Sequence, residues 1–273
     1  MTLTSKKNVV PTTTLSQHRI RLYQPTRRPV EIRQESETQF GRVVVEGKIG
    51  QTHADMMEAI MFCSEKWGEV DGRIKLLVDP ARVRRVAGIT GGRQMADLLR
   101  DLMRVYVKIT VTKPREFTAH GHLIDEVVEA RTAGGELITR PNPLGGERKM
   151  WRVVLGRGLI ELMERDFHVH RDPSAIARLQ HGISQAVARH ALTHRSPPGG
   201  WRLDVLVKAV AGDLSDTNLR HRRHELRADA DALAEIGIEI DGDRVNRVER
   251  AALTRSRAAM TRSRAALTRS VQQ

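Results

Sequence analysis

The stretch SDTNLRHRRHELRADADALAEIG, from Ser215 to Gly237, and the IEIDGDRVNRV that follows it decide the fold of this part of the chain. Apolar residues recur at helical spacing in the first stretch, which predicts one long helix. The second stretch holds two short β-rich runs joined by Asp241-Gly242, a strong signal for a β-hairpin. A helix followed by a hairpin is typical of a helix-turn-helix with a wing.

The charges of this predicted helix run against its dipole. Arginines stand near its start, at 220, 222 and 223, whereas aspartates stand toward its end, at 229 and 231. A helix carries partial positive charge at its amino end, so stability alone favours the opposite order. Ion pairs at helical spacing contribute only about 0.2–0.5 kcal/mol each. We therefore expect the arginines to act on something outside the helix.

A helical wheel separates the residues of this stretch into two faces. Leu219, Leu226, Ala230 and Leu233 form the core face. The opposite face would enter the major groove of DNA, where arginine pairs with guanine edges. We expect this face to read bases and the flanking and hairpin side chains to contact phosphates. The predicted base-reading residues are Thr217, Arg220, His221 and His224, and the predicted phosphate contacts are Arg222, Arg223, Arg227, Arg244, Asn246 and Arg247.

The residues before the long helix complete a winged-helix domain over residues 173–250. We expect a helix over 174–194, a break at the SPPGG of 196–200, a helix over 201–212 and a three-residue turn. The order of this half is then helix, helix, turn, helix and hairpin. That order predicts a DNA-reading domain.

Residues 35–172 have a comparable order, which predicts a first winged-helix domain with an enlarged β wing. Its second helix begins after Thr90, and its outer face mixes arginines with Asp97 and Asp101, so it is a weaker DNA candidate. Self-association of this domain fits at least as well. The candidate DNA contacts on it are Arg93, Arg100 and Arg104. The expected elements are strands at 42–47 and 73–78, helices at 52–67, 80–88 and 91–107, and β-rich runs at 106–112, 123–130 and 150–156.

The net charge of +13 lies mostly in two tails of the 273-residue chain. Residues 1–34 are expected to form a flexible basic arm. Residues 251–273 repeat a seven-residue unit (AALTRSR, AAMTRSR, AALTRSV) and are expected to be an Arg-rich, conditionally helical tail. Such tails either attach to polyanions without specificity or are simply solvated ends. The fold class is therefore α+β, with two winged-helix domains in tandem between flexible basic tails.

Composition excludes several classes of protein. A single cysteine, Cys63, excludes an intramolecular disulfide and any multi-cysteine metal site. No stretch approaches the roughly 18 consecutive apolar residues of a membrane span, and the amino terminus lacks the apolar core of a signal peptide. We expect a cytoplasmic protein with no membrane partner, no metal and no cofactor.

Two winged helices in tandem, the second with a basic helix and a hairpin wing, resemble the plasmid replication initiators of the TrfA-like and related Rep families over residues 40–250. In that family the second domain binds repeated origin sequences (iterons), and the first contributes to dimerisation or further DNA contact. The resemblance implies a bacterial, sequence-specific double-stranded DNA-binding protein that helps open a plasmid origin. It also implies the host initiator protein and the replicative helicase as partners.

Two alternatives remain at this point. A winged-helix transcriptional repressor could use the same architecture. A tyrosine relaxase that nicks DNA could use Tyr23 with His168 and His170, although no third histidine lies between Gly156 and Phe167. No Ser/His/Asp or Cys/His arrangement is indicated by spacing, so we expect that the protein is not an enzyme.

Overall fold

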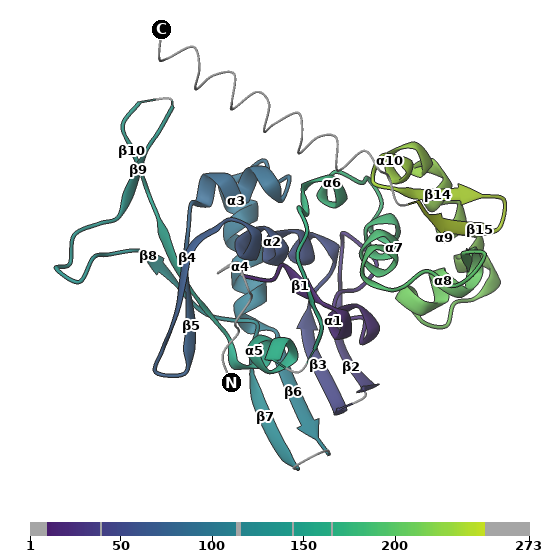
Figure 1. The fold of residues 1–273 in the computed structure, drawn as a ribbon, viewed down its shortest axis with the longest axis horizontal. Coiled ribbons are helices and arrows are strands. Elements are labelled where there is room, and N and C mark those ends of the chain that lie inside the picture. The colour runs from purple at the N-terminus through teal and green to yellow at the C-terminus, as the bar shows by residue number, and fades with distance from the viewer. Residues whose placement is uncertain (1–9, 39, 113–115, 144, 165, 249–273) are drawn as a thin grey trace, which may run out of the picture.

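The computed structural model describes residues 10–38, 40–112, 116–143, 145–164 and 166–248. It confirms the mixed α+β class (Figure 1). The described residues form two hydrophobic cores. The first core is formed by residues between Val10 and Met163, and the second by residues between Ile176 and Val245. The predicted tail over 251–273 lies outside the described residues, as do residues 1–9.

The first domain contains two four-stranded antiparallel sheets. One has the strand order β2-β3-β6-β7 and the other β4-β5-β11-β8, so the strands expected to form a single enlarged wing are divided between the sheets. The division follows from pairing, because β6 bonds to β3 whereas β8 and β11 bond to the sheet of β5. The strands are β2 (Glu31–Thr38), β3 (Gly41–Lys48), β4 (Ser64–Val70), β5 (Arg73–Val78), β6 (Tyr106–Val111), β7 (Phe117–His122), β8 (Ile124–Glu129) and β11 (Trp151–Leu155), and β9 (Thr139–Pro141) pairs with β10 (Glu147–Lys149).

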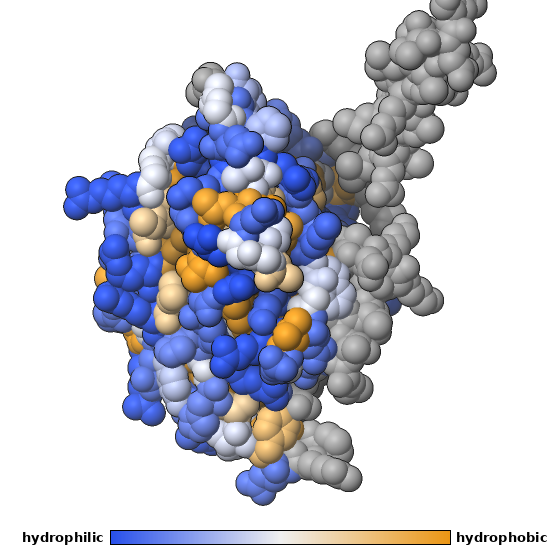
Figure 2. Space-filling model, turned by 90° about the vertical axis from the view of Figure 1, so that its left-hand side faces the viewer, coloured by the Kyte–Doolittle hydropathy of each residue, from blue (hydrophilic) through white to orange (hydrophobic). Residues whose placement is uncertain are grey.

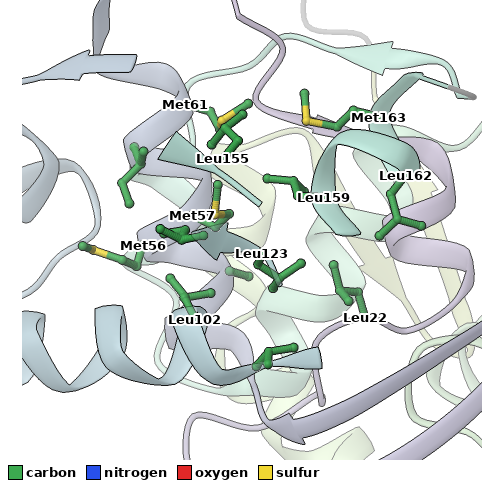
Figure 3. Packing of buried hydrophobic residues seen from close by; sticks show 14 of the residues in the cluster. Leu22, Met56, Met57, Met61, Leu102, Leu123, Leu155, Leu159, Leu162 and Met163 are labelled. Atoms are coloured by element: carbon green, nitrogen blue, oxygen red, sulfur yellow. The ribbon is translucent and has the colours of Figure 1, made fainter. Parts of the chain in front are cut away.

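Four helices pack against these sheets. They are α2 (Gln51–Phe62), α3 (Pro80–Val86), α4 (Gly92–Arg104) and α5 (Arg157–Glu164). Figure 3 shows Met56 and Met57 of α2 beside Leu102 of α4. With few aromatic side chains in the chain, this core is filled by valine, isoleucine, leucine and methionine, and the flexible methionines adapt to irregular gaps. The central position of α2 explains why its residues are buried almost all round.

Helix α2 ends at Phe62, so the predicted extension to Trp67 is wrong. Residues 64–70 instead pair with β5 in a hairpin. Its turn contains Asp71 and Gly72, with φ of 53° and 69°. Both values are left-handed, as an Asp-Gly hairpin turn of this kind requires. The hairpin signal at 71–72 was present in the sequence and outweighs the helical periodicity before it.

The amino-terminal segment is built into the first domain, so the prediction of a flexible arm is wrong for residues 10–34. Strand β1 (Thr13–Thr14) pairs with β12 (His168–Val169), and helix α1 (Leu15–Arg19) follows it. Ile20, Leu22 and Tyr23 are then buried in the first core. These apolar side chains hold the segment in place, because exposing them to water is unfavourable.

The second domain has the element order predicted for a winged helix. Its three-stranded sheet has the order β13-β15-β14, and the expected hairpin is present with Asp241 opposite Arg244. The order helix, strand, helix, helix and hairpin matches a winged helix. The elements are α6 (Ser174–Ala177), α7 (Gly182–Thr193), β13 (Trp201–Arg202), α8 (Leu203–Ala211), α9 (Asp216–Ala228), α10 (Ala230–Glu235), β14 (Ile238–Asp241) and β15 (Arg244–Arg247).

Each of the two long helices predicted for this domain is divided in two: the first into α6 and α7, and the second into α9 and α10. One carboxylate, that of Asp229, lies at both breaks. The buried carboxylate of Asp229, between α9 and α10, accepts the N–H groups of Gln180 and His181 at 3.3 and 3.0 Å, just before α7 begins. Burial opposes ionisation of Asp229, but hydrogen bonds from His181 and Gln180 outweigh it and lower the pKa of this group. The break is thus stabilised by tertiary contacts that local periodicity cannot indicate.

The break also removes the inverted polarity seen in the sequence. Helix α9 has Asp216 in its first turn and Arg227 in its last, and Asp231 lies in the first turn of α10. The two end turns of α9 therefore suit the helix dipole, with an acid in the first turn and a base in the last, although Glu225 follows three arginines within the helix. The charge order alone is consequently no argument for DNA binding, and the argument depends on which side chains are exposed.

A buried ion network joins the two domains. Arg189 of α7 is 1% exposed, and its Nη2 lies 2.6 Å from Asp55 Oδ1 of α2. Its Nε lies 3.2 Å from Glu58 Oε1, which is also 2.5 Å from Arg171 Nη2. Burial would raise the pKa of Glu58, but the charges of Arg171 and Arg189 outweigh it and lower the pKa. Two buried arginines and two buried carboxylates therefore hold α2 against α7.

Candidate nucleic-acid interface

The turn between α8 and α9 places α9 on the surface of the second domain. Helix α8 ends at Ala211 and is followed by Gly212, whose positive φ of 79° favours glycine. Ser215 caps α9 by accepting the N–H of Asn218 at 3.4 Å. Leu226 anchors α9 in the core. Helix α9 thus occupies the recognition-helix position of the motif.

The four residues predicted to read bases all lie on the exposed side of α9. Thr217, Arg220, His221 and His224 are exposed. Arg220 donates from Nε to the carbonyl oxygen of Asp216 at 3.3 Å, a contact within the helix that leaves the far end of the guanidinium in solvent. The wheel therefore assigned this face correctly, and base reading itself stays a prediction.

The predicted phosphate contacts on α9 differ from one another. Arg223 is half-buried and ion-paired, with its Nε 3.3 Å from Asp204 of α8 and a second contact to Asp243 in the hairpin turn. Arg227 is more exposed and lies 3.5 Å from the same Asp243. Arg222 is half-buried on the other flank, 2.8 Å from Glu225. Of the three, Arg227 is the one best placed for an outside partner.

Sequence reasoning missed the two aspartates that hold Arg223. Asp204 begins α8 and Asp243 sits in the hairpin turn, so the pair links three elements around one guanidinium. A charged residue in an Asp-Gly-Asp turn gives no sequence signal for a partner in a helix. Arg223 therefore links α9 to α8 and to the hairpin through ion pairs in the free protein.

The three predicted phosphate contacts in the hairpin also differ from one another in exposure. Arg244 and Arg247 are exposed, and Arg244 Nη1 lies 3.3 Å from the carbonyl oxygen of Gly199. Asn246 is half-buried and packs so closely on Gly200 that a methyl group on that glycine would collide with its amide. Asn246 thus supports the base of the wing, whereas the two arginines are free to reach out from it.

Helix α4 of the first domain carries the three weaker candidates. Arg93, Arg100 and Arg104 are exposed, as the wheel predicts. Arg100 bonds Asp97 at 2.7 Å, so these two charges neutralise each other. Asp101 in turn accepts a hydrogen bond from buried His53 at 3.2 Å. Neither Arg93 nor Arg104 has a carboxylate partner among the described residues.

The geometry does not assemble the nicking site considered from the sequence. The Tyr23 hydroxyl is buried without a hydrogen-bond partner in the described part of the chain, and burial raises the pKa of this group well above its usual value of 10. His168 Nε2 lies 2.9 Å from the carbonyl oxygen of Met163. A nucleophile must reach the scissile phosphate as the phenolate, which this position prevents. Nicking with Tyr23 is therefore abandoned.

Two features are absent from the described residues, which leave out 1–9, 39, 113–115, 144, 165 and 249–273. Within the described ranges, no group of three or more His, Cys, Asp or Glu side chains could hold a metal ion, and no helix is both long and apolar enough to cross a membrane. On the side of the molecule that lies to the left in Figure 1, apolar residues form only small areas among hydrophilic ones (Figure 2). Self-association through the first domain stays a prediction.

Comparison with known proteins relates the chain to solved structures alone. No protein-family profile and no curated protein sequence matches it. The crystal structure of selenomethionine derivatives of domain 2 and domain 3 of RctB matches with a TM-score of 0.55 and 11% identity, covering 86% of this chain and 96% of that one. Another crystal structure of RctB domains 2-3 matches with a TM-score of 0.48 and 13% identity, covering 81% and 82%. The chain therefore has the fold of domains 2 and 3 of RctB.

Proposed function

We propose that this protein is a sequence-specific double-stranded DNA-binding protein that initiates replication at repeated plasmid origin sequences. The exposed face of α9, with Thr217, Arg220, His221 and His224, carries the proposal. These side chains stand at the recognition position of a winged helix and suit base edges in the major groove. The fold shared with RctB, a replication initiator, supports the initiator role.

In this role α9 enters the major groove while Arg227, Arg244 and Arg247 contact phosphates on either side of it. The tandem arrangement suits a site longer than one domain covers. One helical turn of DNA is about 10.5 bp, so a two-domain footprint amounts to about 20 bp. The protein would act in the bacterial cytoplasm, open the origin with the host initiator protein and recruit the replicative helicase. It needs no cofactor and no catalytic residue for these steps.

The decisive experiment is nuclease protection with the purified full-length chain on the DNA that flanks its gene. Protection of several directly repeated elements supports an initiator. Protection of a single palindrome over a promoter would favour a repressor. Arg220→Ala should reduce discrimination between the protected repeat and random DNA by about 1–3 kcal/mol. Equal affinity of the wild type for repeat and random DNA would refute sequence-specific binding.

A further inference from the structure

The segment from Arg21 to Gln34 runs between the two candidate DNA-binding helices, with a groove on each side. We call them the α4 groove and the α9 groove. The α4 groove has a volume of about 520 Å³ and the α9 groove about 420 Å³. The α4 groove is lined by side chains of this segment, of Lys48 at the end of β3, and of α2 and α4. The α9 groove is lined by the same segment together with Val210, Ala211, Leu214 and Arg222.

The α4 groove carries an excess of unpaired positive charge. Arg28, Lys48 and Arg93 line it and are exposed, and none of them has a carboxylate partner in the described ranges. Arg27 also lines it and donates from Nη1 to the carbonyl oxygen of Leu179 at 3.0 Å; its charge acts on Asp55 from a distance, and it makes no carboxylate ion pair in the described ranges. Four cations therefore face one groove.

The two acids of this groove, Asp97 and Asp101, offset these cations only in part. Asp97 is bound to Arg100 at 2.7 Å, and Asp101 is bound to His53 at 3.2 Å. Burial lowers the pKa of His53, so it is a neutral partner near pH 7 and leaves one acid to offset part of the excess. Counting these six groups, with Arg100 cancelling Asp97, the lining retains a net charge near +3. The excess is a property of the groove and not of the whole chain.

In the α9 groove, by contrast, the positive charges are compensated. Arg33 lies 3.2 Å from Glu46, and Arg222 lies 2.8 Å from Glu225, so two of its three arginines are paired. The third, Arg21, has a left-handed φ of 52° and directs its guanidinium toward Gly212 at the end of α8. Partial negative charge at that helix end compensates it. Unpaired charge is thus concentrated on the α4 side of the segment.

We propose that the α4 groove binds the sugar-phosphate backbone of double-stranded DNA through Arg28, Lys48 and Arg93. The inference rests on the proposed DNA-binding function and extends it to a segment that precedes both predicted winged helices. The groove adjoins the amino-terminal half of α4, the recognition position of the first domain. Phosphates occur about every 1.7 Å along the duplex axis, so three long cationic side chains in one groove match a short run of them. Such contacts position the duplex and carry no sequence information.

The test compares Lys48→Ala/Arg93→Ala with a matched control, Lys66→Ala/Arg73→Ala, which removes the same charge from exposed positions on the β4–β5 hairpin. The probes are a duplex selected by the wild type from a random library and a 30-bp duplex of random sequence. Removing two phosphate contacts should lower the slope of log affinity against log salt by about 2. At 0.1 M salt this corresponds to binding about 50-fold weaker, equally for both probes. Adding Arg28→Ala should lower the slope by about one more.

If the salt slope of the groove variant equalled that of the control variant, the proposal that the α4 groove binds DNA would be refuted. A change in sedimentation of the free protein with an unaltered salt slope would overturn it as well, because the groove would then serve self-association. Thermal melting should be the same for all variants, since the substituted side chains are exposed. The two proposals fail separately. If the wild type does not prefer the selected duplex, the proposed function fails. If Arg220→Ala loses that preference while the groove variants bind normally, the groove alone fails.

Discussion

Replacing Arg189 by methionine tests whether the buried network holds the two domains together. The substitution keeps an unbranched apolar stem but removes three contacts, to Asp55 Oδ1 at 2.6 Å, Glu58 Oε1 at 3.2 Å and Gln51 Oε1 at 2.7 Å. Glu58 keeps Arg171, whereas Asp55 keeps, among the described residues, the amide of Gln185 at 3.1 Å and the more distant charge of Arg27. One buried carboxylate then lacks a direct ion pair.

Breaking a buried ion pair from one side costs about 3–5 kcal/mol. We expect the free energy of unfolding in urea to fall by this amount. Because the network lies between domains, we also expect the single transition to divide into two, with the second domain unfolding first. Circular dichroism at 222 nm monitors the whole transition, and fluorescence of Trp201, which packs on the second core, monitors the second domain in a Trp67→Phe/Trp151→Phe background.

The matched variant is Asp55→Asn together with Arg189→Met. It removes the uncompensated charge, so it should recover part of the loss and give a coupling of at least about 1 kcal/mol. If Arg189→Met cost less than 1 kcal/mol and the transition stayed single, the network would be dispensable and the domains would be joined by other contacts.

Three further outcomes are expected. Asp243→Ala frees Arg227 and leaves Arg223 paired with Asp204 alone, so it should strengthen DNA binding at low salt several-fold in a mobility-shift assay; weaker binding would show that the pairs serve to shape the site. Tyr23→Phe removes a buried hydroxyl that lacks a partner, so the free energy of unfolding should stay within about 1 kcal/mol of the wild type in urea titration, and a larger loss would reveal a hidden partner. Burial lowers the pKa of His190 from 6.5 to about 4, so the unfolded chain binds more protons between these values. Stability should fall as pH drops through this window, by at most about 3 kcal/mol at 1.36 kcal/mol per pH unit, and His190→Gln should flatten calorimetric Tm against pH there.

Periodicity and turn chemistry predicted the second domain well. Asp241-Gly242 marked the hairpin, and the wheel placed Thr217 and Arg220 outside and Leu226 inside. These are local properties, set within a turn or two of helix. The same local signals could not indicate Asp229, because its role depends on N–H groups about fifty residues away in the chain.

The wrong predictions for the first domain also arose because local sequence signals do not report contacts between distant residues. Arg27 and Arg28 resembled part of a charged tail, yet Ile20 and Leu22 before them are buried. Composition averages over such a segment and hides the short apolar run inside it. Lys48 gave no signal at all, since its importance comes only from lying across a groove from Arg93. Which charged side chains share one surface can be predicted only when the pairing of the strands is known.

The pairing of Thr13 and Thr14 with Val169 and His168 has a consequence for synthesis on the ribosome. Strand β1 leaves the exit tunnel before β12, so it cannot complete its pairing until residues about 155 positions later have followed it. At 5–20 residues per second this wait lasts on the order of ten seconds or more. During that time Ile20 and Leu22 belong to a segment without its partner strand. Nascent chains stalled before residue 168 should therefore be captured by chaperones through their amino-terminal residues, and chains stalled well after it should not.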